Sequence, residues 1–162
     1  MSFDAIVQRL QNIAPFNIHK INEDGTTEPW FKVTGPLIIK DLIVAEDALA
    51  EQLQTVSGRI AYWGRLVAQT KRVWDIKSRE YRVWRSTMYL MYRNDGEKHT
   101  EKELDSLIRT QPAYPILYAA VETAEEAYNA TLAILNGWKS KQKVMESTVF
   151  RRNTEDGPVL SI

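Results

Sequence analysis

Cysteine is absent from the 162-residue chain, so neither a disulfide framework nor a cysteine-based zinc site can be built from it. No apolar stretch approaches the ~18 residues that a membrane-spanning helix needs. Residues 1–6 lack the basic region followed by an apolar core that marks a secretory signal. These absences predict a cytoplasmic protein that does not enter a membrane.

Catalytic and cofactor motifs are missing as well. Neither phosphate-loop pattern, G-x-x-x-x-G-K-[ST] or G-x-G-x-x-G, occurs in the chain. Of the two histidines, His99 stands four residues before Glu103, a spacing that is found between metal ligands. No further residue nearby completes the coordination shell of a metal ion. The sequence therefore predicts a protein that binds partners and is not an enzyme, with no catalytic residue, metal or cofactor.

A long heptad pattern is the main feature that the sequence does contain. From residue 49 to residue 91, apolar or aromatic residues recur at alternating spacings of four and three, and eleven of thirteen positions keep the pattern. Such a repeat favours coiled-coil-like packing. A helix over about 42–92 would be about 75 Å long, far longer than a compact core of this size. It therefore needs to pack on another helix or on another subunit. Gly58 and Gly64, inside it, are interpreted as points of close helix packing.

The partner helix is expected from the same chain. A second heptad pattern covers about 115–149, and a short helix over about 100–110 begins with the capping box Thr100 and Glu103. These patterns predict a mainly α fold, a long antiparallel helical hairpin of coiled-coil type with a short intervening helix. We expect this hairpin domain to cover residues 37–152 and a flexible tail to cover 153–162.

A small N-terminal α/β appendage is expected over residues 1–36. The apolar spacing of residues 2–13 predicts a short helix, and residues 16–21 alternate apolar and polar as a half-buried strand does. Asp24-Gly25 is a turn signal, and the returning strand is predicted from Trp30 to Val33. Pro29, directly before it, makes this second strand a weaker prediction.

The charges come in blocks although the net charge is zero. Residues 56–93 have a net charge of +7, whereas residues 41–55 have −4 and residues 94–136 have −5. On the heptad wheel seven of the nine basic residues of 56–93 form a stripe opposite the apolar seam or flanking that position, and arginine forks suit phosphate. Tyr89 and Tyr92, which lie off the seam, are candidates for base stacking. The candidate nucleic-acid-binding residues are Arg65, Lys71, Arg72, Arg79, Arg82, Arg85 and Arg93.

Two alternatives remain open at this point. The arginines can instead form ion pairs with the acidic segments 41–55 or 94–126, in the same chain or a neighbour. The aromatic residues on the seam are expected in the core rather than against bases, because they keep the apolar period. They are Trp63, Trp74, Tyr81 and Trp84.

The order of these features resembles the phage recombination mediator proteins of the UvsY type. The resemblance covers about residues 41–153. It includes the basic, Trp-containing helix from Tyr62 to Arg93, the segment from Thr100 to Ile108 and the last amphipathic helix. Residues 1–40 are an addition to the family pattern, and the seam is richer in Trp.

The resemblance implies a specific function. Such mediators bind single-stranded DNA, form ring-like homo-oligomers, and help load a RecA-like recombinase onto DNA coated by a single-strand binding protein. Basic residues near the end of the first long helix contact DNA in that family, and the matching residues here are Arg79, Arg82 and Arg85, with Arg93 beyond. For a phage protein the location would be the host cell cytoplasm. The alternative is a helical structural, assembly or inhibitor protein that acts only through protein–protein contacts.

Overall fold

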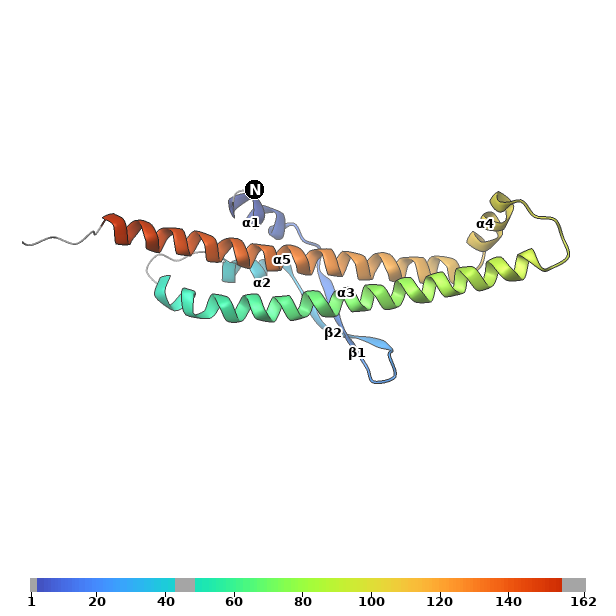
Figure 1. Cartoon of the computed structure of the whole chain (residues 1–162), viewed down its shortest axis with the longest axis horizontal. Helices are drawn as coiled ribbons and strands as arrows, with labels where there is room; N and C mark the ends of the chain where they lie inside the picture. The colour runs from blue at the N-terminus through green and yellow to red at the C-terminus, as the bar shows by residue number, and fades with distance from the viewer. Residues whose placement is uncertain (1–2, 43–48, 156–162) are drawn as a thin grey trace, which may run out of the picture.

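The computed structural model describes residues 3–42 and 49–155 and is mainly helical (Figure 1). Two long helices lie side by side along most of their length, with the N-terminal elements against one half of the pair and a short helix at the opposite end. In chain order the elements are α1 (Phe3–Gln11), β1 (Phe16–Ile21), β2 (Thr27–Val33), α2 (Gly35–Leu42), α3 (Leu49–Arg93), α4 (Glu101–Arg109) and α5 (Ala113–Glu155).

The antiparallel pair of α3 and α5 is the main body of the molecule. The helices have 45 and 43 residues, so each is about 65 Å long. All heptad positions from residue 49 to 88 on α3 and from 117 to 149 on α5 are buried or partly buried, which confirms the predicted helical hairpin. Met91 is the exception at 50% exposure. Thr70 is accommodated in the buried seam because its hydroxyl donates to the Leu66 carbonyl, 3.0 Å away.

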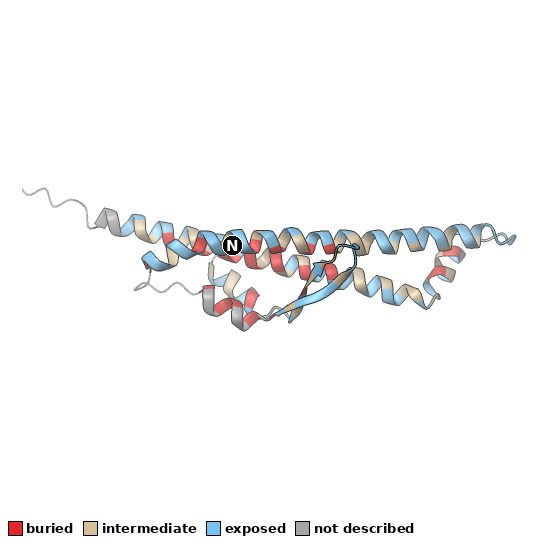
Figure 2. Cartoon of the chain, turned by 90° about the horizontal axis from the view of Figure 1, so that it is seen from below, coloured by how far each residue is buried: buried red, intermediate tan, exposed pale blue. Residues whose placement is uncertain are grey.

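Burial along α3 is uneven. Figure 2 shows buried residues gathered where the N-terminal elements meet the long helices. The last fully buried residue of α3 is Val73, and the following twenty residues reach only intermediate burial, although they keep the heptad period. The half of α3 that lies beyond the N-terminal elements is therefore covered less completely.

The N-terminal elements share one hydrophobic core with the long helices. Leu10 of α1 is 1% exposed and fits against two glycines. A Cβ on Gly35 would lie 2.8 Å from the Leu10 carbonyl oxygen, and one on Gly137 would lie 2.9 Å from Leu10 Cδ1. Gly35 and Gly137 are thus points of close packing. The interpretation of Gly58 and Gly64 is wrong, because a Cβ on either would meet nothing within 4 Å.

Helix α2 is the element that the sequence pattern missed. Gly35 and Pro36 begin a helix instead of closing a region, which a proline in the first turn permits. The long helix is described from Leu49 rather than from about 42, and residues 43–48 lie outside the described part. The boundary at residue 36 stays a prediction.

The predicted β-hairpin is confirmed, with a bulge. β1 pairs antiparallel with β2, and the register places Ile18 opposite Phe31 but His19 opposite Pro29. Trp30 is therefore the extra residue between these pairs, and its side chain is 53% exposed. Ile18, on the inner face, is fully buried (0%).

The segment between the long helices agrees with its prediction. Thr100 caps α4 through the predicted capping box with Glu103, and Leu104 and Ile108 are buried. Helix α5 begins two residues before the expected position and continues through residues 153–155 of the predicted tail; residues 156–162 lie outside the description. Across the described ranges, every helix is too short or too polar to traverse a bilayer.

Candidate nucleic-acid interface

All seven candidate cations lie on α3 and are exposed. Three of them, Arg65, Arg72 and Arg79, are spaced by seven residues on one side of the helix, and none forms an ion pair with a described residue. Seven helical residues rise about 10 Å, so this row spans about 21 Å. We refer to these three residues as the arginine row. Its guanidinium groups are open to an anionic partner.

Arg82 and Lys71 flank the arginine row. Arg82 donates through Nε to the Ser78 carbonyl, 3.1 Å away, which leaves its terminal nitrogens uncommitted within the described chain. Lys71 Nζ lies 3.6 Å from Asp75 Oδ1 and 5.4 Å from the Trp74 ring centroid. Lys71 is thus partly neutralised, whereas Arg82 extends the open cationic surface.

The two remaining candidates pair with α4, which folds back on α3. Arg85 donates to Asp105 Oδ1 at 2.9 Å, and Arg93 to Glu101 Oε1 at 3.0 Å. The hydrogen bond from Arg85 lowers the pKa of the Asp105 carboxyl. The sequence left open whether the arginines form ion pairs with the acidic segment 94–126. Arg85 and Arg93 do so, whereas the members of the arginine row do not. In the other acidic segment, residues 43–48 lie outside the described chain.

The two tyrosines singled out for base stacking are held by neighbouring side chains. Tyr89 donates to Glu101 Oε1 at 2.7 Å and accepts from Arg93 at 3.0 Å. The Gln111 amide donates to the Tyr92 hydroxyl. Both rings are partly buried near α4, and the Arg93 guanidinium lies over the Tyr89 ring, 5.9 Å from its centroid.

The seam aromatics pack within the protein, as expected. Trp63 is 9% exposed, and the Trp74 ring stacks on Tyr128 of α5, with centroids 5.6 Å apart. Tyr81 and Trp84 both contact Tyr114 at the start of α5, with ring centroids 6.3 and 6.5 Å away. The ring contacts of Trp74, Tyr81 and Trp84 with tyrosines of α5 thus join the two long helices.

Surface hollows follow the cationic side of α3. The first has a volume of about 610 Å³ and lies between the hairpin and α3; its lining is Lys20, Ile21, Trp30, Ala68, Gln69 and Arg72. A second hollow, of about 810 Å³, is lined by Gly25, Arg72, Asp75, Ile76, Arg79, Glu80, Val83 and Trp84. A third, of about 540 Å³, is lined by Tyr81, Arg82, Arg85, Ser86, Tyr89 and Leu90. Four of the seven candidate cations therefore line hollows rather than a flat surface.

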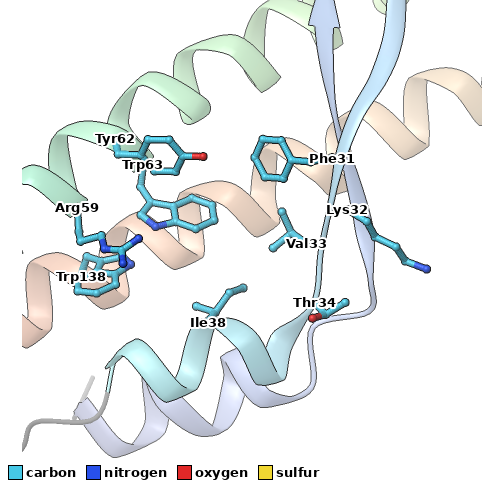
Figure 3. Close-up of a pocket in the computed structure, with 9 residues that line it drawn as sticks. All are labelled: Phe31, Lys32, Val33, Thr34, Ile38, Arg59, Tyr62, Trp63 and Trp138. Atoms are coloured by element: carbon cyan, nitrogen blue, oxygen red, sulfur yellow. The ribbon is translucent and has the colours of Figure 1, made fainter.

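A separate cavity of about 250 Å³ lies where the hairpin, α2, α3 and α5 meet (Figure 3). The close-up shows the Tyr62 hydroxyl directed toward Phe31, while the Lys32 side chain points away from the cavity. The Arg59 guanidinium lies 5.9 Å from the centroid of the Trp138 ring. Apolar and aromatic groups dominate this lining, so the cavity is an extension of the core and not of the cationic surface.

Trp30 and Lys20 are surface residues near Arg72 that were not among the candidates predicted from the sequence. The hairpin brings both into the hollow that Arg72 lines. The sequence did contain a signal for the exposure of Trp30, because it follows Pro29 in a weak strand, and a proline that interrupts a strand favours a bulge. Their position against α3 depends on tertiary contacts that no local pattern gives.

His99 and Glu103 are not brought together as ligands. His99 Nε2 lies 3.1 Å from Asp95 Oδ2, while the Glu103 carboxylate accepts from the Thr100 backbone at 2.7 Å. Over the described ranges, no three His, Asp or Glu side chains are grouped as a metal site would need.

No family model, curated protein or solved structure matches the chain.

Proposed function

We propose that this protein binds single-stranded DNA along the exposed side of α3. The observation that carries the proposal is the arginine row, in which Arg65, Arg72 and Arg79 are exposed and have no ion-pair partner among the described residues. Most other cations of this helix have one: Lys71, Lys77, Arg85 and Arg93 each lie within 3.6 Å of a carboxylate. An unneutralised, linear array of guanidinium groups suits a phosphate backbone.

The proposed binding does not depend on base sequence. Contacts from arginine to phosphate carry no base information, and each neutralised phosphate of a single strand adds about −0.7 to the slope of log affinity against log salt. The arginine row with Arg82 supplies four contacts, so we expect a slope of about −3 for one chain. Such binding is weak at physiological salt, and several chains acting together would be needed for useful affinity.

We further propose that the chain forms a homo-oligomer. Val83, Leu90 and Met91 are 61%, 58% and 50% exposed on the half of α3 that the N-terminal elements leave uncovered. Association through Leu90 and Met91, at the end of α3 beyond Arg82, would cover apolar surface and repeat the arginine row without covering it, in a ring if the contacts close on themselves.

Following the resemblance, we propose that the oligomer acts as a recombination mediator. In this role it would help load a RecA-like recombinase onto single-stranded DNA that a single-strand binding protein has coated. A weak, salt-sensitive and multivalent contact fits such a role, because a mediator must release DNA to the recombinase. The resemblance supports the choice of recombinase, and the arginine row supports DNA binding.

The second candidate is a helical assembly protein without a nucleic-acid role. The exposed apolar residues at the end of α3 favour it, since they call for a protein partner whether or not DNA binds. The ion pairs from α3 to α4 are also consistent with purely structural charges.

Light scattering with a labelled single-stranded oligonucleotide, at low and high salt, separates the two candidates. The mediator proposal predicts an oligomer that retains the strand at low salt and releases it as salt rises. An oligomer that never retains the strand would favour the assembly protein and remove the proposal.

A further inference from the structure

Trp30 projects from the hairpin at the β-bulge. The inner face of the sheet is filled by Ile18 and Val33, which are 0% and 5% exposed. Among the described aromatic rings Trp30 contacts only Phe31, in a T-shaped pair with centroids 4.9 Å apart and ring planes at 73°. More than half of its surface stays in solvent, so the hairpin core does not account for a tryptophan here.

Trp30 lines the same hollow as a member of the arginine row. It lines the hollow of about 610 Å³ that Arg72, the middle member of the arginine row, also lines. The Gln69 amide donates to the His19 carbonyl and so fastens the hairpin to α3 beside this hollow. A flat apolar ring from the hairpin and an unpaired guanidinium from α3 therefore line one space, which the fold itself holds in place.

The charge of the hollow favours an anionic ligand. Two of its six lining residues, Lys20 and Arg72, are cationic, and none is acidic. Glu28 neutralises Lys20 at 2.6 Å, whereas Arg72 has no ion-pair partner in the described chain. The next hollow continues from Arg72 to Arg79, so a phosphate chain bound along the row would pass directly beside Trp30.

We propose that Trp30 stacks on one unpaired base of a single strand whose phosphates are bound by Arg72 and its neighbours in the arginine row. This inference rests on the proposed function and names what the N-terminal hairpin adds to it. Arginine contacts to phosphate do not by themselves separate single strands from duplex, but a base that is already paired and stacked cannot reach Trp30. Trp30 is thus a specificity residue for unpaired DNA.

The test compares an oligothymidylate strand, the same backbone carrying abasic sites, and a duplex, with wild type, Trp30→Ala and Trp30→Phe. Loss of one stacking contact weakens binding by about tenfold. We expect that loss for Trp30→Ala on the thymidylate strand, little loss for Trp30→Phe, and an unchanged salt slope for both. Wild type should prefer thymidylate to the abasic strand, and Trp30→Ala should bind the two alike.

A matched control is Ile116→Ala, which removes another apolar side chain that is 71% exposed, on α5; it should bind like wild type. Circular dichroism verifies that each variant is folded. The inference is overturned if Trp30→Ala binds thymidylate as wild type does, or if it weakens thymidylate and abasic strands equally. If wild type retains no strand at all, the proposed function itself fails, which is a different result from either of these.

Discussion

The Arg85 guanidinium reaches across from α3 to the Asp105 carboxylate of α4 at 2.9 Å. Arg109 holds the other carboxylate oxygen at 2.8 Å, so Asp105 lies between two cations. With the Arg93–Glu101 pair, this contact places acidic side chains of α4 on the distal end of the cationic stripe. A phosphate approaching Arg85 must compete with a carboxylate that is already bound.

Removal of that carboxylate should strengthen DNA binding. Asp105→Asn keeps the shape of the side chain but releases Arg85, so we expect a modest gain in affinity for single strands and a steeper salt slope by up to about 0.7. Fluorescence anisotropy at several salt concentrations measures both. Asp4→Asn, an exposed acid on α1 with the same charge change, is the control, and an equal gain there would mean that only net charge matters.

Two glycines should respond in opposite directions to alanine. Gly64 is inside α3 with open space where a Cβ would be, so Gly64→Ala should raise the free energy of unfolding by about 0.5–1 kcal/mol. Gly35→Ala should lower it, because the new Cβ would lie 2.8 Å from the Leu10 carbonyl oxygen, which is backbone and cannot move aside cheaply. Urea denaturation measures both changes. A stabilising Gly35→Ala would contradict the α1–α2 contact.

The stability should depend on the protonation of His19. Burial, and then the nearby Lys77 charge, lower the pKa of His19 in the folded state. The unfolded chain therefore binds the proton more readily than the folded chain. As a result, the free energy of unfolding decreases as pH falls from about 6.5 through the lowered pKa of the folded state. Thermal melts between pH 5 and pH 8 should show this decline, and His19→Gln should flatten it. A decline of the same size in the variant would assign the effect to other groups.

Charges introduced on the uncovered half of α3 should dissociate the oligomer. Leu90→Glu with Met91→Glu places two carboxylates on exposed apolar positions, so we expect a lower mass in light scattering with the helicity retained. Gln54→Glu with Ser57→Glu adds the same charge at exposed positions on the opposite half of α3 and serves as the control. An unchanged mass in the first variant would place the interface elsewhere.

The regular parts of this fold could be predicted from the sequence because they repeat. A strict heptad period identifies α3 and α5 and their buried sides, and a capping box identifies the start of α4. Helix α2 was missed because it begins with Gly35 and Pro36, which ordinarily signal a break.

The candidate site was predicted only in part, for a related reason. Helical spacing determines that Arg65, Arg72 and Arg79 share one side of α3, but it does not tell which cations meet a carboxylate. That depends on how α4 folds back, a contact that joins Arg85 to a residue twenty positions away. The bulge that exposes Trp30 likewise depends on strand register, so this residue became a candidate only once the hairpin was placed against α3.

The salt dependence of single-strand binding by Arg72→Ala with Arg79→Ala tests the central claim most directly. We predict weaker binding and a salt slope shallower by about 1.4, whereas Lys139→Ala with Lys143→Ala, which removes two exposed cations from α5, should leave the slope as in wild type. An unchanged slope in the arginine variant, or an equal change in both variants, would show that the arginine row is not where the phosphates bind.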